Sequence, residues 1–315
     1  MGSRPTVVRP RRLLVAAPGT LWVVPLNATR YKALPRPGVF SEIISLDVME
    51  YPEKGRGPAG DTALPPVIAG RRSRYYACSV KLRVGTSGYG YKEWKGKFYP
   101  RDISAREMLP FYSSHFDAVE INNTFYRMPG KELLARWAAQ VPDDFVFALK
   151  AARIITHIRR LKDAEEETRY LIETAASLGR RLGPILFQLP GSLAKDLSRL
   201  EAFLNLLSGT TAAFEFRNPS WLDTETFDLL RARGHALCVS DREPEQLPTV
   251  VSTAPWGYLR LRRPGYSDSD LALWLESVAA QPWETAYIFF KHEDQAEGPA
   301  LAKRFLGLTG LKTSG

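Results

Sequence analysis

Cysteine is scarce in this sequence, and the two that occur exclude the sites that cysteines commonly build. Among 315 residues only Cys78 and Cys238 are cysteines, and neither belongs to a Cys-x-x-Cys pair. A disulfide framework and a cysteine zinc site are therefore not expected. Such sparse cysteine usage is typical of a protein from a reducing compartment, so we expect a cytoplasmic location.

Long apolar runs and nucleotide-binding fingerprints are also missing. No uninterrupted apolar stretch approaches the roughly 20 residues that cross a bilayer, so no membrane-spanning helix is expected. A basic stretch at 9–12 precedes LLVAAPGTLWVVPL, but Pro18, Gly19 and Pro25 interrupt that run, which disfavours a signal peptide. The GTSG at 85–88 lacks the spacing of GxGxxG and of a phosphate-binding P-loop, so no cofactor is predicted.

Positive charge is in excess, but it is concentrated at one end of the chain. The net charge is +9, and residues 1–80 hold 12 of the 43 Lys and Arg but 5 of the 34 Asp and Glu. The remainder is nearly neutral, so a nucleic-acid surface on the main domain is not favoured. Residues 1–80 are also rich in Pro and Arg without periodicity. They predict a poorly ordered or peripheral extension, followed by one domain at 81–307 and a tail at 308–315.

From Lys81 onward, short β-rich runs alternate with helical patterns. The runs are Leu82–Gly85, Ala118–Asn122, Phe145–Lys150, Ile185–Leu189, Ala213–Arg217, Ala236–Ser240, Gly257–Arg262 and Ala286–Phe290. The helical segments are Ala105–His115, Lys131–Gln140, Asp163–Leu182, Leu197–Leu207, Thr224–Arg233, Asp270–Ala280 and Glu297–Phe305. Ser104, Asp223 and Asp268 are the expected helix starts. The connection after Ser240 contains three prolines and predicts a loop or a very short helix.

Eight strands that alternate with helices predict a (β/α)8 TIM barrel in a single domain. An open, doubly wound sheet is the alternative, because strand count does not prove closure. The period of two along each strand places small and apolar residues inside first and charged residues at the carboxyl-terminal ends. The charged inward set is Glu120 and Glu215 with Lys150, Arg217, Arg260, Arg262 and Lys291.

Two carboxylates against five cations leave a positive surplus where barrel enzymes build their active sites. The surplus predicts an anionic substrate, phosphorylated or nucleotide-like, and acid/base chemistry. The expected catalytic residues are Glu120, Glu215, His157 and His292. The expected substrate-binding residues are Thr86, Ser87, Asn122, Thr124, Lys150, Gln188, Arg217, Trp221, Arg260 and Lys291.

Three other interpretations of this ring stay open. Glu120 and Glu215 could serve only as counter-ions to the cations in an internal salt-bridge layer. The barrel mouth could grip a nucleic-acid end or a partner peptide without catalysis. A divalent metal could bind Glu120, Glu215, Asp241 and His292 in an isomerase or phosphodiesterase, although the abundant Lys and Arg oppose a cation.

Six motifs follow one another in a characteristic order. They are GTSGYGYKEWKGKFYP, FDAVEINNTFYRMP, FALKAARIITH, GPILFQLP, EFRNPSW and FFKHED with the following EGPALA. This pattern resembles the YecE-like family, domain of unknown function 72, from about Lys81 to Leu306. The resemblance implies a TIM-barrel fold and brings no established reaction.

The family pattern includes ten of the polar and aromatic residues, without giving them roles. They are Thr86, Glu120, Asn122, Thr124, Lys150, His157, Gln188, Glu215, Arg217 and Trp221. One departure is that many relatives end the eighth strand with paired asparagines, whereas this chain has Lys291, His292 and Glu293. A role that rests on those asparagines does not carry over to this chain.

Overall fold

The computed structural model describes residues 12–17, 20–25, 80–127, 129–241, 248–292 and 294–309. The chain divides into two units between Ala69 and Gly70. In the first unit, strand β1 (Arg12–Ala17) pairs with β2 (Thr20–Pro25) as an antiparallel hairpin. The prediction of a peripheral extension over 1–80 otherwise concerns residues outside the described ranges, as does most of the predicted tail at 308–315.

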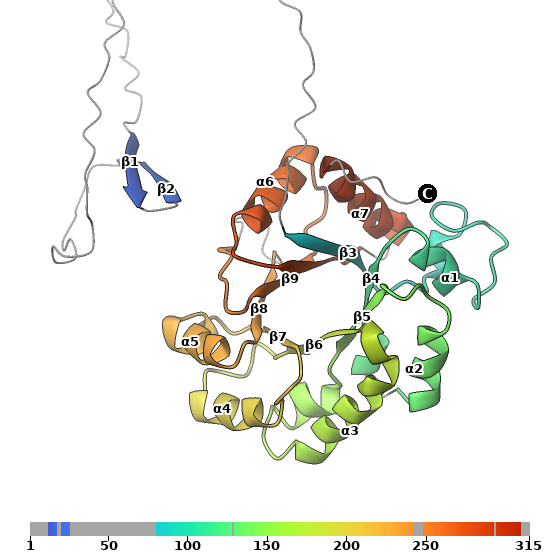
Figure 1. Ribbon diagram of the computed structural model, residues 1–315, viewed down its shortest axis with the longest axis horizontal. Helices are drawn as coiled ribbons and strands as arrows, with labels where there is room; N and C mark the ends of the chain where they lie inside the picture. Colours follow the sequence, from blue (N-terminus) through green and yellow to red (C-terminus); the bar gives the residue numbers. More distant parts are fainter. Residues whose placement is uncertain are drawn as a thin grey trace, which may run out of the picture. The chain divides into compact units, whose positions relative to one another are not determined.

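Eight parallel strands close into a barrel in the second unit (Figure 1). They are β3 (Lys81–Ser87), β4 (Ala118–Ile121), β5 (Val146–Lys150), β6 (Leu182–Gln188), β7 (Ala212–Glu215), β8 (Ala236–Ser240), β9 (Trp256–Leu261) and β10 (Thr285–Phe290). Each strand pairs with the next in the chain, and β10 pairs with β3 to complete the ring. The predicted TIM barrel is thus confirmed, and the open sheet is excluded.

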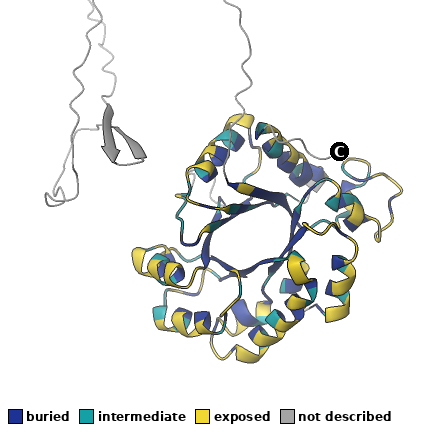
Figure 2. Cartoon of the chain, viewed as in Figure 1, coloured by how far each residue is buried: buried dark blue, intermediate teal, exposed yellow. Residues whose placement is uncertain are grey.

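Helices surround the strands, with their buried sides toward the barrel and their exposed sides outward (Figure 2). They are α1 (Met108–Ser113), α2 (Lys131–Ala138), α3 (Glu165–Ala175), α4 (Leu197–Asn205), α5 (Thr224–Ala232), α6 (Asp268–Ala279) and α7 (Glu297–Leu308). Residues 248–255, before β9, contain no helix, in agreement with the proline-rich pattern there. In the described ranges, no helix has the length and apolar character needed to cross a membrane.

Of the three predicted helix starts, one is confirmed and two are corrected. Asp223 caps α5 as predicted, because its side chain accepts the backbone N–H of Thr226. The cap of α6 is Ser267 rather than Asp268, since Ser267 and Asp270 form a reciprocal capping box. Ser104 does not start a helix, because α1 begins only at Met108.

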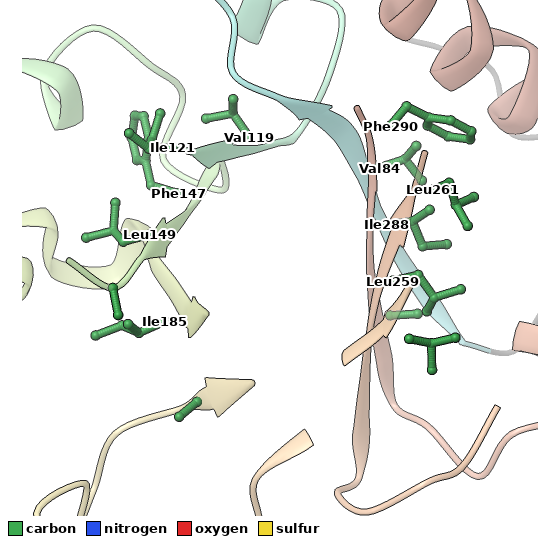
Figure 3. Close-up of a cluster of buried hydrophobic side chains, with 14 of the residues drawn as sticks. Val84, Val119, Ile121, Phe147, Leu149, Ile185, Leu259, Leu261, Ile288 and Phe290 are labelled. Atoms are coloured by element: carbon green, nitrogen blue, oxygen red, sulfur yellow. The ribbon is translucent and has the colours of Figure 1, made fainter. Parts of the chain in front are cut away.

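The alternation along the strands separates two apolar layers. The outer layer, drawn in Figure 3, includes Val84, Val119, Ile121, Phe147, Leu149, Ile185, Leu259, Leu261, Ile288 and Phe290, which point away from the barrel interior. The inner layer includes Ala118, Val146, Ala148, Leu186, Ala213, Cys238, Tyr258 and Phe289. The inward positions expected from the period of two are therefore the observed ones. The inner apolar layer forms the floor beneath the charged residues at the carboxyl-terminal ends.

Candidate functional site

Arg260 lies at the centre of the charged layer inside the barrel. It comes from the end of β9, and its side chain is 1% exposed. Its Nε and Nη2 donate to Glu120 Oε1 at 3.2 and 2.9 Å, and its Nη1 donates to Glu215 Oε2 at 2.5 Å. The guanidinium thus joins β4 and β7 across the barrel. A buried cation needs such partners, because an unpaired charge in the interior is very costly.

Glu120 accepts from three side chains on two other strands, β3 and β9. Besides Arg260, Ser87 Oγ donates to its Oε1 and Tyr258 OH to its Oε2, both at 2.7 Å. Gly85 allows β3 to approach β4 closely, since a Cβ at this position would lie 1.9 Å from the carbonyl oxygen of Ala118. Every donor to Glu120 stabilises its charged form.

Glu215 lies next to two further arginines and one amide donor. Gln188 Nε2 donates to its Oε1 at 3.3 Å, Arg217 Nε donates to the same oxygen at 3.4 Å, and Arg262 Nη1 lies 3.8 Å from it. Burial opposes ionisation of this carboxyl, but the charges of Arg260 and Arg217 outweigh it and lower its pKa to about 2. Burial likewise opposes ionisation of Glu120, but the charge of Arg260 and the hydrogen bonds outweigh burial and lower the pKa of Glu120 as well. Both carboxylates stay ionised at neutral pH, which favours the counter-ion interpretation over proton transfer.

Lys150 is not part of these ion pairs. It ends β5, and its Nζ lies 4.1 Å from the centre of the Phe125 ring. Burial, followed by the charge of Arg260, lowers the pKa of Lys150 to about 8. Within the described ranges no carboxylate oxygen lies within 4.0 Å of its ammonium group. The cation is thus half-buried, and no acidic side chain of the described residues pairs with it.

His157 lies beside the same aromatic ring. Its imidazole meets Phe125 edge to face at 4.9 Å, and its Nδ1 is 2.9 Å from Thr156 Oγ1. Burial, followed by the charges of Lys150 and Arg217, lowers the pKa of His157 below its usual range. The ring is therefore neutral at physiological pH and able to accept a proton.

The backbone around His157 is unusual. Ile154–Ile158 form one turn of π-helix, a rare geometry that is frequent at functional sites. Arg160, Leu161 and Asp163 then adopt positive φ angles of 51°, 67° and 48°. Such strain in residues other than glycine persists only where the surrounding structure enforces it. No periodic pattern of apolar residues predicted this segment.

Three polar atoms near the barrel mouth are buried without a hydrogen-bond partner in the described part of the chain. They are Asn122 Nδ2, Arg262 Nη1 and Ser240 Oγ. The amide of Asn122 is oriented by its Oδ1, which accepts from Arg260 Nη2 at 3.4 Å. Two of the three atoms can only donate, and the described residues offer them no acceptor, so they are available to the oxygens of a ligand.

Three predicted binding residues have structural partners instead. Thr86 faces the helices, and its Oγ1 bonds the Tyr112 hydroxyl at 2.9 Å and the Gly88 carbonyl at 2.6 Å. Thr124 Oγ1 donates to the carbonyls of Ile121 and Lys150, which ties β4 to β5.

The third of these residues is Trp221, whose side chain is completely buried. It stacks on Phe216 at 4.9 Å and donates its indole N–H to the Leu193 carbonyl at 2.8 Å. Trp221 was one of the residues predicted to bind a ligand. The structure corrects this expectation, because no face of the indole is open to one.

The residues after β10 give a mixed result. His292 Nε2 is 2.8 Å from the Arg263 carbonyl and its ring contacts Tyr266, so in the described structure it lies apart from the Arg260 cluster. Lys291 is half-buried at the same end of the barrel, where its backbone N–H donates to the Leu261 carbonyl. Its predicted role in binding stays a prediction.

The metal interpretation gains no support from the side-chain geometry. Glu120 and Glu215 are held by Arg260, and Asp241 accepts from Tyr266 and from the backbone of Arg262. In the described ranges, no group of three or more His, Cys, Asp or Glu side chains is arranged to hold a metal ion.

Three residues of this site were not among the predicted catalytic or binding residues. The period of two placed Arg262 in the charged inward set and gives Tyr258 the same inward parity, but neither was assigned a role. Phe125 had no such signal, because the short 3-10 helix Asn123–Phe125 sets its direction. The aromatic ring that joins Lys150 to His157 is visible only in three dimensions.

A cavity of about 680 Å3 opens beside the charged layer. Its wall includes Glu215, Arg217 and Ser240, and it continues between β7 and β8 toward α5. It is therefore continuous with the groups that surround Arg260.

Comparison with known proteins gives the same fold and family. The chain is 24% identical over 230 residues to the UPF0759 protein YunF of Bacillus subtilis, covering 68% of this chain and 79% of that protein. It is 26% identical over 227 residues to the UPF0759 protein YecE of Escherichia coli K12, covering 61% of this chain and 82% of YecE.

A solved DUF72 family protein from Thermotoga maritima superposes with a TM-score of 0.62 and 27% identity, covering 72% of this chain and 99% of that one. The family described as "Protein of unknown function DUF72" matches residues 83–315. This match spans the barrel from Arg83 in β3 onward and agrees with the six ordered motifs. The chain therefore belongs to the DUF72 family.

Proposed function

We propose that this protein is an enzyme that acts on a small anionic substrate, phosphorylated or nucleotide-like, at the carboxyl-terminal end of the barrel. The observation that carries the proposal is the excess of N–H donors without acceptors at the mouth. Lys150 lacks a carboxylate partner, and Asn122 Nδ2 and Arg262 Nη1 lack any hydrogen-bond partner in the described structure. Oxygens of a phosphate or carboxylate would satisfy all three.

The roles follow from the electrostatics of each group. Arg260, fixed between Glu120 and Glu215, holds the layer beneath the substrate in a rigid arrangement. Arg217, Arg262 and Asn122 bind the anion, and Gln188 holds Glu215 in place. Positions fixed before the substrate arrives lose little free energy to reorganisation, which is the basis of electrostatic catalysis.

Proton transfer is assigned to Lys150 and His157. A pKa of about 8 lets Lys150 exchange a proton near neutral pH, and the lowered pKa of His157 keeps this ring neutral and able to act as a base. Glu120 and Glu215, which were expected to transfer protons, are better suited to hold Arg260. His292 is not assigned a part in the reaction.

A ligand screen tests the proposal. Thermal shift with a panel of phosphorylated metabolites and nucleotides should give at least one stabilising ligand, and mass spectrometry should find related anions in gently purified protein. Lys150→Met and Arg262→Gln should each remove most of the shift, whereas Lys131→Met, at an exposed position on α2, should leave it unchanged. No shift with any anion, or equal shifts in all three variants, would refute the proposal.

Salt dependence separates this proposal from a nucleic-acid-binding role. Binding of a small anion through two or three cations should weaken only moderately between about 50 and 200 mM salt. Binding through six or more phosphates loses roughly a thousandfold or more in affinity over that range. Isothermal titration calorimetry at both salt concentrations measures the difference.

A further inference from the structure

Strands β7 and β8 pair over only part of their length, so they separate toward their carboxyl-terminal ends. The two strands pair at Ala213 with Ala236 and at Phe214 with Leu237, and the pairing stops there. Beyond this point β8 continues to Ser240 beside β9, while the chain after β7 turns toward the short 3-10 helix Pro219–Trp221. The separation lies next to Glu215, at the carboxyl-terminal end.

The cavity of about 680 Å3 occupies this separation, and its lining changes from polar to apolar along its length. Near the barrel interior it is lined by Glu215, Arg217 and Ser240. Farther out it is lined by apolar side chains. These include Phe216, Leu222, Phe227, Val239 and Val251.

The size of the cavity exceeds what an anion alone requires. Pockets of roughly 300–1,000 Å3 hold whole organic ligands, and most of their wall is apolar with a few polar groups that fix orientation. Ser240 Oγ, which lines the cavity, is buried without a hydrogen-bond partner in the described structure. An unsatisfied hydroxyl at the junction of the polar and apolar parts points to a ligand that spans both.

We propose that the substrate carries an apolar substituent, alkyl or aromatic, which lies in the cavity between β7 and β8 while its anionic group lies on Arg217 and Arg262. This inference rests on the proposed function and narrows its substrate class. One molecule can occupy both places, because Glu215 and Arg217 belong to both the cavity wall and the charged layer. The cavity therefore holds the apolar end of the molecule whose anionic end lies on the arginines.

Calorimetry with a homologous series tests this inference. The probes are inorganic phosphate, methyl, butyl and hexyl phosphate, phenyl phosphate, and hexanol as the uncharged control. Affinity for wild-type protein should rise about fourfold for each methylene that enters the cavity. A gain with phenyl phosphate that exceeds the gain with hexyl phosphate would identify the substituent as aromatic, and the reverse would identify it as alkyl.

Substitutions in the cavity wall test whether the gain in affinity with chain length arises there. Thr249→Trp, at an exposed position on the cavity wall, should abolish the gain with chain length and leave binding of inorganic phosphate intact. Leu222→Asn, at a side chain that is 54% exposed, should reduce the gain without disturbing the fold. Thr211→Trp, at the opposite end of β7, is the matched control and should behave as wild type.

The outcomes separate the two proposals. If phosphate binds and chain length has no effect, the apolar substituent is refuted and the proposed function stands. If neither phosphate nor any alkyl phosphate binds, both are refuted. If hexanol binds as tightly as hexyl phosphate, the anion contributes nothing and both are again refuted.

Discussion

At the scale of single residues, the Arg260 guanidinium carries one positive charge that two buried carboxylates share. Replacing Glu120 by Gln would put a neutral amide in place of the carboxylate that accepts from Nε and Nη2 of Arg260 in the barrel interior. We expect Glu120→Gln to lower the free energy of unfolding by roughly 3 kcal/mol, because breaking a buried ion pair exposes the remaining partner to an apolar environment. Urea unfolding monitored by circular dichroism measures the change.

An exposed glutamate gives the control for this experiment. Glu132→Gln on α2 makes the same chemical change at the surface and should alter stability by no more than about 0.5 kcal/mol. Equal stabilities of Glu120→Gln and Glu132→Gln would contradict the central place of the ion cluster.

Glu215 makes stability depend on pH in a defined direction. Its pKa in the folded protein is about 2, against the ordinary 4.5. The folded state therefore binds fewer protons than the unfolded state between these values, so the stabilisation is complete above about pH 5 and is lost as pH falls toward 2. The loss should amount to roughly 3 kcal/mol. Urea unfolding at pH 5, 4 and 3 should show a shallower fall for Glu215→Gln than for wild type.

The lowered pKa of Lys150 predicts selective chemical reactivity. At pH 8 about half of its amines are neutral, whereas ordinary lysines are almost fully protonated. An amine-reactive reagent at this pH should label Lys150 before the exposed Lys131, and a bound anion should slow the labelling by raising the pKa of Lys150 again. Peptide mass spectrometry would record both effects, and labelling unaffected by any anion would count against Lys150 as a substrate contact.

The sequence predicted which side chains point into the barrel, but it did not predict which of them pair with one another. The period of two placed Glu120, Glu215 and Arg260 inside, because strand alternation is a local property. It did not distinguish a counter-ion from a proton donor, since that depends on distances across a closed ring. Trp221 was predicted to bind substrate, but its indole is buried and packs on Phe216, a contact that the strand pattern does not show.

At the scale of elements, the contact between β3 and β4 depends on Gly85. Gly85→Ala should lower the free energy of unfolding by about 1–3 kcal/mol or more, because the new methyl would overlap the carbonyl oxygen of Ala118. Gly90→Ala is the matched control, since no atom lies within 4 Å of the added methyl there. Thermal unfolding of both variants tests the difference, and similar midpoints would contradict the close approach.

Regular elements were predictable, and irregular ones were not. All eight barrel strands lie within a few residues of their predicted positions, because each has a strong apolar and alternating pattern. The π-helical turn Ile154–Ile158 and the 3-10 helix Asn123–Phe125 had no such pattern. These two irregular segments carry His157 and Phe125, so local patterning failed where the candidate chemistry lies.

At the scale of the whole molecule, the barrel closes without residues 1–78, because β10 pairs directly with β3. We expect a chain that begins at Ser79 to match the full chain in thermal stability. Differential scanning calorimetry of the two chains makes the comparison. A large fall in the melting temperature of the shorter chain would show that the N-terminal residues contribute to the fold.

The link from Arg260 to Glu120 and Glu215 also constrains the order in which the barrel assembles. Arg260 follows Glu120 by 140 residues and Glu215 by 45, so both carboxylates leave the ribosome long before their cation. Until β9 is synthesised, Glu120 lacks the guanidinium of Arg260 and the hydroxyl of Tyr258, and burying its charge without them to close the interior is costly. We therefore expect the nascent barrel to stay open and hydrated until its seventh strand arrives. The ion cluster then acts as a check against premature collapse during translation.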